Sequence, residues 1–330
     1  MGQNDAVTVA LITGINGQDG YFLSRILISE GYKVIGIGTR NNPSHYLDPR
    51  IQYECCDIRD VDKIVNICIK YGVFEVYNLA GVSSVAESFR NPELTKAVNF
   101  DSPSRMLTSF YTNPKLAENI RFFQASSSEM YGVSNLEPQD EDTPLAPVSP
   151  YGRWKAEMHQ FCHDYAQRGF FVSSAIMYNH ESFLRPTTFI TRKVSRTVSE
   201  IALNLAEKLI LGNLHAERDW GFAGDFAQAI RLIMKQDLPE SFVVATGKTN
   251  SVLELVKIAF REVGFEGREE EFIEVNDDLL RPNEINRLVG NSMRLRKNLG
   301  WNPTLNFESI VRSMVQFDLS ELKNSASNQD

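Results

Sequence analysis

Short unbroken runs of hydrophobic residues recur along the first half of the chain, with longer amphipathic segments between them. A run without polar alternation is typical of a strand buried on both faces, as in a parallel sheet. Such runs predict strands at residues 7–13, 33–37, 51–56, 74–79, 121–126 and 171–178. Apolar residues at helical spacing predict helices between them, notably at 60–71, 93–110 and 150–168. Alternating strands and helices predict an α/β fold with a doubly wound parallel sheet.

The pattern changes after Tyr178, where loops rich in Arg, Pro and Asn connect the predicted elements. Helices are predicted near residues 192–205, 225–235, 252–263 and 307–317. The apolar run at 241–247 predicts a strand that would return to the main sheet. We therefore predict a Rossmann domain over residues 1–178, rejoined by about 219–250, and a smaller mixed α/β substrate domain over 179–330 on its C-terminal side. The polar tail at 323–330 is expected to fray.

Composition argues against a nucleic-acid-coating, membrane-spanning, secreted or disulfide-rich protein. The chain has 330 residues, 42% of them hydrophobic and 23% charged, and its net charge of −8 argues against a surface that coats nucleic acid. No apolar run is long enough to span a bilayer and the N-terminus lacks a signal-peptide pattern, so a cytoplasmic location is expected. The four cysteines show no Cys-x-x-Cys spacing, so neither a disulfide framework nor a metal site is expected. Cys55 and Cys56 are interpreted as buried apolar residues.

The turn after the first predicted strand carries glycines at Gly14, Gly17 and Gly20 and leads directly into an amphipathic stretch. In a strand–turn–helix context this spacing predicts a dinucleotide site, because backbone N–H groups at a helix N-terminus can approach a pyrophosphate. The bare spacing also occurs in turns that bind nothing. The second strand ends at Arg40 without the carboxylate that would bond the ribose 2′-hydroxyl of NAD, and an arginine can neutralise a 2′-phosphate. This favours NADP.

Tyr151 and Lys155 are four residues apart, on one face of a predicted helix. A nearby ammonium stabilises a phenolate, so the tyrosine is expected to exchange a proton at neutral pH. Ser127 and Glu129 follow the fifth predicted strand, where a hydroxyl can bond a substrate oxygen and a carboxylate can act as general base. Taken singly, these side chains are also explained by chance spacing, turn chemistry or a solvated loop.

Together these motifs resemble the extended short-chain dehydrogenase/reductase family and, within it, the GDP-mannose 4,6-dehydratases. The resemblance covers nearly the whole chain. Its more specific segments lie at residues 17–20, 179–182, 191–193, 211–221, 281–284 and 299–303. It implies conversion of GDP-mannose, or a close GDP-sugar, to the 4-keto-6-deoxy sugar nucleotide through an internal NADP redox cycle.

The resemblance also implies roles for single residues. Ser127, Tyr151 and Lys155 would assist hydride removal from C4 of the hexose, and Glu129 would take the C5 proton before the C6 hydroxyl leaves as water. Predicted cofactor contacts are Gly14, Asn16, Gly17, Gln18, Asp19, Gly20, Arg40, Asp57, Ile58, Leu79, Ala80, Tyr151 and Lys155. Predicted substrate contacts are Ser83, Glu129, Asn179, Lys193, Leu211, Gly212, Asn213, Arg218, Arg281 and Glu284.

Three segments depart from the family pattern. The loop after the second strand lacks the paired arginines and serine-rich extension that reach a neighbouring subunit, so a homodimer is expected, with a tetramer as the alternative. Val82 and Ser84 stand where the family commonly has Gln and His, and residues 183–186 replace Pro-Arg-Arg-Gly. These changes leave open a different sugar, or a 4-ketoreductase or epimerase on the same fold. A non-catalytic dinucleotide sensor would have lost its catalytic side chains, and all are present.

Overall fold

A central sheet of seven parallel strands is present in the computed structural model, which describes residues 7–134, 136–276, 279 and 285–327. The strand order is β11-β6-β5-β4-β1-β2-β3, and every neighbouring pair is parallel. The strands are β1 (Val9–Thr13), β2 (Lys33–Gly38), β3 (Gln52–Cys55), β4 (Glu75–Asn78), β5 (Arg121–Ser127), β6 (Val172–Met177) and β11 (Ser241–Val244). This confirms the predicted α/β sheet, including the strand expected at 241–247.

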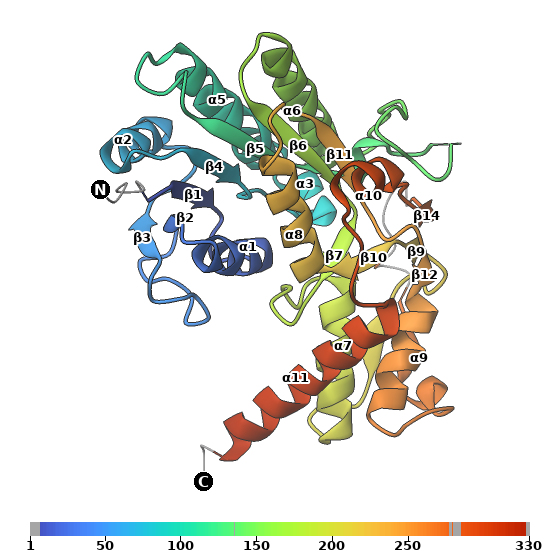
Figure 1. The fold of residues 1–330 in the computed structure, drawn as a ribbon. Helices are drawn as coiled ribbons and strands as arrows, with labels where there is room; N and C mark the ends of the chain where they lie inside the picture. Colours follow the sequence, from blue (N-terminus) through green and yellow to red (C-terminus); the bar gives the residue numbers. More distant parts are fainter. Residues whose placement is uncertain (1–6, 135, 277–278, 280–284, 328–330) are drawn as a thin grey trace.

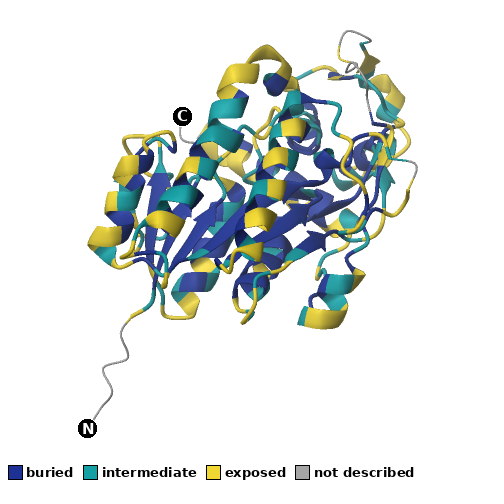
Figure 2. Ribbon diagram, turned by 90° about the horizontal axis from the view of Figure 1, so that it is seen from above, coloured by how far each residue is buried: buried dark blue, intermediate teal, exposed yellow. Residues whose placement is uncertain are grey.

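Helices cover both faces of this sheet (Figure 1). On one face, apolar side chains of α1 (Gln18–Ser29) and α8 (Ala223–Met234) join a buried cluster with the strands. On the other face, α2 (Val61–Tyr71), α5 (Ser102–Thr112) and α6 (Pro150–Gln167) do the same. Figure 2 shows the result as a buried sheet between helices whose outer sides are exposed. Burial on both faces explains why the strand sequences are apolar throughout rather than alternating.

The order in which successive strands are added to the sheet reverses between β3 and β4. It builds β1, β2 and β3 toward one edge and then crosses back to place β4 beside β1. The ends of these two strands are tied together, since Thr13 Oγ1 donates to Asn78 Oδ1 at 2.8 Å and accepts from the Ala80 N–H at 3.1 Å. A parallel sheet binds its ligands at such a reversal, outside the carboxyl ends of the strands.

The predicted helix at 93–110 is divided into three parts. It begins as α4 (Pro92–Lys96), continues as a π-helical turn (Ala97–Asp101) and ends as α5, and a further short helix, α3 (Val85–Arg90), precedes it. Pro103, in the first turn of α5, has no N–H to donate to the preceding turn, and Ser102 Oγ donates to the Ala97 carbonyl at 2.6 Å instead. Pro103 and the side chain of Ser102 therefore change the backbone hydrogen bonding at this point, and the spacing of hydrophobic residues could not have predicted this change.

The second part of the chain packs around its own apolar cluster, built mainly from three helices that lie together in the lower part of Figure 1. They are α7 (Ile190–Ala202), α9 (Val252–Glu262) and α11 (Phe307–Ser327); α10 (Met293–Leu299) and the one-turn helices η2 (Ser128–Met130) and η3 (Glu269–Glu271) complete the helices. Short strands join them: β7 (Asn179–Glu181), β8 (Leu209–Leu211), β9 (Glu217–Arg218), β10 (Trp220–Phe222), β12 (Asn250–Ser251), β13 (Ile273–Val275) and β14 (Arg287–Leu288). The division into domains at residue 178 stays a prediction.

One expectation about the chain's periphery was wrong. Cys55 is exposed, because β3 is an edge strand with only one neighbour, whereas Cys56 is buried. In the C-terminal tail, α11 continues to Ser327, and residues 328–330 of the segment expected to fray lie outside the described residues. As for membranes, none of the helices in the described residues combines the length and apolarity needed to cross one.

Candidate active site

The glycine-rich turn has a shape that only glycine permits at two of its three positions. A Cβ on Gly14, whose φ is +73°, would lie 2.8 Å from the Ala80 nitrogen, and a Cβ on Gly20 would lie 2.6 Å from the Ile15 carbonyl oxygen. At Gly17 the nearest atom to a Cβ is the Gly14 oxygen, at 3.3 Å. Gly17 is also the N-cap of α1 and has no side chain to cap the helix. The first N–H groups of α1 are therefore available to an anion such as a pyrophosphate.

The other predicted cofactor residues lie along the carboxyl ends of neighbouring strands. Arg40 is exposed after β2, and its carbonyl accepts a hydrogen bond from Tyr53 Oη at 2.6 Å. Asn16 Oδ1 accepts from the Ser44 N–H at 2.8 Å, which fixes the loop beyond Arg40. Asp57 pairs with Arg59 at 2.7 Å, and Ile58 is buried. The side chain of Gln18 bonds the protein itself, because Nε2 donates to the His180 carbonyl at 2.8 Å.

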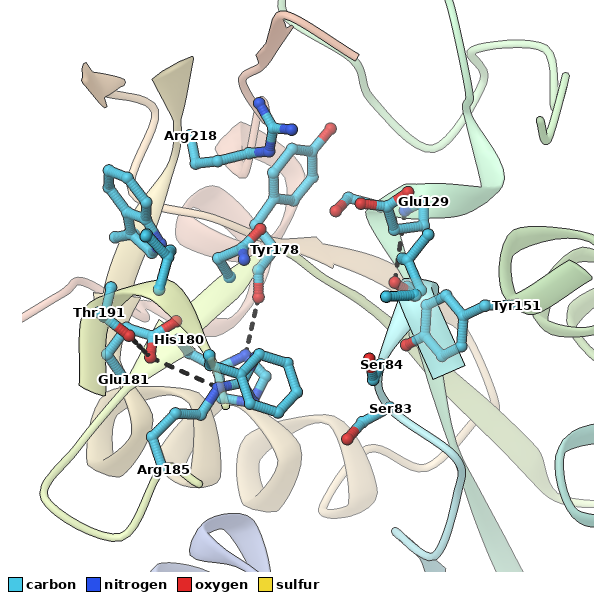
Figure 3. Close-up of a pocket in the computed structure, with 18 of the residues that line it drawn as sticks. Ser83, Ser84, Glu129, Tyr151, Tyr178, His180, Glu181, Arg185, Thr191 and Arg218 are labelled. Carbon is cyan, nitrogen blue, oxygen red and sulfur yellow. Dashed lines mark hydrogen bonds and ion pairs between the residues drawn. The ribbon is translucent and has the colours of Figure 1, made fainter. Parts of the chain in front are cut away.

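A cavity of about 330 Å³ opens at the carboxyl ends of β5 and β6 and extends toward α7 and β8–β10. Among the predicted residues it brings together Asp19, Leu79, Ser83, Ser127, Glu129, Tyr151, Lys155, Asn179, Lys193, Leu211, Gly212, Asn213 and Arg218. The three turn glycines, Asn16, Gln18, Arg40, Asp57, Ile58 and Ala80 do not line it. Arg281 and Glu284 lie outside the described residues. In Figure 3, Glu129, Tyr151, Ser83 and Ser84 form one wall, and Arg218, Tyr178, Thr191, Glu181 and Arg185 form the other.

Burial controls the ionisation of the Tyr151–Lys155 pair. It raises the pKa of Tyr151 to about 12, although the hydrogen bond with Ser127 opposes the rise. It lowers the pKa of Lys155 to about 8. The Lys155 ammonium donates to the Ala125 carbonyl at 2.8 Å and lies 5.8 Å from the centre of the Tyr151 ring. Desolvation therefore outweighs the distant ammonium in setting the pKa of Tyr151 in this structure, and the proton exchange expected of Tyr151 stays a prediction.

Glu129 is held on the same wall by backbone packing. It lies in the 3-10 turn η2 that follows β5, and its N–H is 3.3 Å from Ser127 Oγ. The first turn of α6 is pressed against this turn, since a Cβ on Gly152 would lie 2.5 Å from the Glu129 carbonyl oxygen. Gly152 therefore allows α6 to place Tyr151 beside Ser127 and Glu129. A hydroxyl, a phenol and a carboxylate on one wall can exchange protons with a bound alcohol.

Sequence reasoning assigned no role to three residues of the opposite wall, His180, Glu181 and Thr191. His180 Nε2 lies 3.0 Å from Asp19 Oδ1, and both side chains line the cavity. Burial alone would lower the pKa of His180, but the carboxylate of Asp19 reverses this and raises it; likewise burial would raise the pKa of Asp19, and His180 lowers it. Glu181, Arg185 and Thr191 also line the cavity. Their segment was recognised, but only the fold brings residues 180–191 against the first turn of α1.

Residues 11–314 match the family model described as GDP-mannose 4,6 dehydratase. The chain belongs to this family. It is 36% identical to GDP-mannose 4,6 dehydratase 2 of Arabidopsis thaliana, over 96% of this chain and 88% of that protein. It is also 36% identical to GDP-mannose 4,6 dehydratase of Homo sapiens, over 96% of this chain and 92% of that protein.

Solved structures extend the likeness to the fold of other dehydratases and of epimerases. A dTDP-glucose 4,6-dehydratase from Streptomyces venezuelae, with NAD and TYD bound, superposes with a TM-score of 0.83 at 20% identity, covering 96% of this chain and 98% of that chain. A UDP-glucose 4-epimerase from Thermotoga maritima gives 0.84 at 21% identity, covering 96% of this chain and all of that one. At these identities the likeness concerns the fold alone, which the GDP-mannose 4,6-dehydratase family therefore shares with both.

Proposed function

We propose that this protein is a hydro-lyase that removes water from GDP-mannose, or a close GDP-sugar, to give the 4-keto-6-deoxy sugar nucleotide. Membership of the GDP-mannose 4,6-dehydratase family supports the reaction. The observation that carries the proposal is one cavity in which Ser127, Glu129, Tyr151 and Lys155 are collected. A carboxylate beside a hydroxyl and a phenol favours elimination over simple reduction, because elimination needs a base for a C–H proton as well as an acid–base pair for the alcohol.

The residues divide the chemistry between them. Ser127 and Tyr151 would hold the C4 oxygen and its proton, and Lys155 would keep the phenol oriented. Glu129 would take the proton from C5, which a C4 ketone acidifies, and then protonate the C6 hydroxyl as it leaves as water; once the hydride is back on C6, a proton from solvent would return to C5. The residues that fit a dinucleotide are those of the uncapped α1 N-terminus, with Arg40 and Asp57 toward the adenosine. When bound, an oxidised nicotinamide cofactor supplies a hydride acceptor and returns the hydride within the same cycle.

The opposite wall suits the diphosphate of a sugar nucleotide. Helix α7 begins at the cavity after Phe189, which provides no side-chain cap, so its first N–H groups are available to an anion. Lys193 lies in the first turn of α7, and Arg218 faces the cavity from β9. A guanidinium can bond phosphate through two parallel N–H groups. We place the diphosphate here, with Asn179 beside it.

NADP is the proposed cofactor, and Arg40 provides the test. Its exposed side chain at the end of β2 would neutralise a 2′-phosphate. Arg40→Ala is expected to raise the Kd for NADP⁺ about tenfold, the effect of losing one charged hydrogen bond, and to leave NAD⁺ binding within about twofold. Titration calorimetry with both nucleotides measures this. Equal losses for NAD⁺ and NADP⁺ would contradict the assignment.

The buried amine of Lys155 predicts a pH-dependent stability. Its pKa is about 8 in the folded chain and 10.5 in its ordinary state, so between these values the unfolded chain binds more protons and folding stability rises with pH. Relative to Lys155→Met, the wild-type free energy of unfolding is expected to increase by about 3 kcal/mol from below pH 8 to above pH 10. Urea unfolding of both proteins at pH 7, 8.5 and 10 measures the difference. Parallel pH profiles would show that the amine keeps an ordinary pKa.

A homodimer is proposed for the assembly. Phe89 on α3 and Leu94 on α4 are 44% and 41% exposed, and both helices pack beside α6. Apolar side chains exposed on neighbouring helices are typical of a surface that a second subunit covers. Light scattering coupled to size-exclusion chromatography determines the mass in solution.

The proposed reaction is tested directly with purified protein, GDP-mannose and a catalytic amount of NADP⁺. A product lighter by one water, formed without net NADPH, supports the dehydratase cycle. If GDP-mannose gives no product, the same assay with other GDP-, CDP- and UDP-sugars identifies the substrate class. Stoichiometric consumption of NADPH on a 4-keto sugar would replace the proposal with a ketoreductase.

A further inference from the structure

Glu181 is a buried carboxylate in the wall where we place a negatively charged diphosphate. It is the last residue of β7, is 2% exposed and lines the cavity. Its backbone is fixed because β7 pairs with β10, with Glu181 opposite Phe222. A carboxylate in this position would repel a diphosphate if no cation or hydrogen-bond donor neutralised it. Glu181 has such partners on this wall.

The two contacts of Glu181 reach two separate segments of the wall. Its Oε2 accepts a hydrogen bond from Thr191 Oγ1 at 2.5 Å, and it lies 3.4 Å from Arg185 Nε (Figure 3). Thr191 belongs to the first turn of α7, the same turn that carries Lys193. Arg185 belongs to the loop between β7 and α7. One carboxylate therefore joins two of the segments that bring a cation to this wall, the loop that carries Arg185 and the first turn of α7.

The guanidinium of Arg185 is held from two directions. Its central carbon lies 3.8 Å from the centre of the Phe189 ring, and Glu181 faces its Nε. The closest approach of the pair is between Glu181 Oε2 and Arg185 Nε, at 3.4 Å, and Arg185 lines the cavity where an anion would bind. An arginine held in this way loses little side-chain freedom on binding a phosphate, because its plane is already fixed. The negative charge of Glu181 also offsets the repulsion between the cationic side chains of Arg185 and Lys193.

We propose that Glu181 is a positioning residue, whose carboxylate fixes Arg185 and the first turn of α7 so that this wall is preorganised for a diphosphate. The inference rests on the proposed function, because it takes the ligand to be a nucleoside diphosphate sugar. Glu181 would touch neither the reacting carbons nor the leaving hydroxyl. It would act through Arg185 and Thr191.

The experiment measures GDP binding by calorimetry, with kcat and KM for GDP-mannose, using the full chain. Glu181→Gln keeps the shape but removes the charge, and it is expected to weaken GDP binding about tenfold with kcat within about threefold. Arg185→Ala should weaken GDP binding at least as much. The double variant should lose much less GDP affinity than the sum of the two single losses, because without Arg185 the carboxylate of Glu181 has only Thr191 and the first turn of α7 left to position. Thr191→Val, which removes only the hydroxyl, should have a smaller effect.

Glu200→Gln is the matched control. Glu200 forms the same kind of pair with Arg196, at 2.8 Å within α7, and does not line the cavity. Its GDP binding and turnover should equal those of the wild type. If Glu181→Gln does not fold, Arg185→Lys replaces it as the test. A lysine keeps the positive charge, but its single ammonium cannot bond a carboxylate and an anion side by side as a planar guanidinium can. GDP binding should therefore fall about as in Arg185→Ala.

Additive losses in the double variant would overturn the proposal. So would a lower kcat at unchanged GDP affinity for Glu181→Gln, which would place Glu181 at the reacting atoms. Wild-type GDP binding in Glu181→Gln, or in Arg185→Lys, would overturn it as well. If the wild-type chain bound no GDP, the proposed function would fall and this inference with it. The first three results leave the proposed function intact.

Discussion

Replacing Glu129 with glutamine is expected to lower kcat for water loss from GDP-mannose by about 10²- to 10⁴-fold, the usual contribution of a positioned general acid–base group. The amide keeps the size and hydrogen-bonding reach of the carboxylate but cannot take the C5 proton. Glu129 shares one cavity wall with Ser127 and Tyr151, and the close approach of Gly152 to its carbonyl fixes that arrangement. The loss should therefore appear in kcat, with GDP binding within about threefold of wild type.

Two measurements separate this role from a general disturbance of the site. In D₂O the wild-type product should carry deuterium at C5, and Glu129→Gln should return unlabelled GDP-mannose. Glu87→Gln is the matched control, because Glu87 lies in the nearby helix α3, does not line the cavity and should turn over as the wild type does. Wild-type turnover in Glu129→Gln would mean that another group takes the C5 proton, and the proposed assignment would be wrong.

Replacing Asp318 with alanine is expected to lower the free energy of unfolding by about 3–5 kcal/mol, the usual cost of leaving one buried charge without its partner. Asp318, on α11, is fully buried and bonded to Arg192 on α7, which is itself buried. It also accepts from Ser195 Oγ at 2.7 Å. The alanine variant would leave the buried Arg192 guanidinium with neutral partners, the Phe183 carbonyl and Ser195 Oγ, in place of the carboxylate of Asp318. Urea unfolding followed by circular dichroism measures the loss.

The control for this prediction is an ion pair on the surface. Arg268 and Glu271 are 2.7 Å apart and both more than half exposed, so Glu271→Ala should leave stability nearly unchanged. If Asp318→Ala were no more destabilising than Glu271→Ala, water would have to reach Arg192. In that case the contact between α7 and α11 would be open to solvent.

The sequence by itself determined the elements whose signals are local. Buried strands need unbroken apolar runs, so the sheet was predictable. The glycine turn was predictable because Gly14, Gly17 and Gly20 follow the first strand at a fixed spacing and lead directly into a helix. The face shared by Tyr151 and Lys155 follows from helical geometry alone. Each of these features depends on residues close together in the chain or on one repeating geometry.

Tertiary structure decided what the side chains do. The ionisation of Tyr151 and Lys155 depends on burial, which brought the pKa of one to about 12 and the other to about 8. The contact of His180 with Asp19 joins β7 to the first turn of α1, and the Arg192–Asp318 pair joins residues 126 positions apart. Exposure of Cys55 followed from the edge position of its strand. Desolvation and long-range contacts exist only once the chain has folded, so no local pattern of residues could have predicted them.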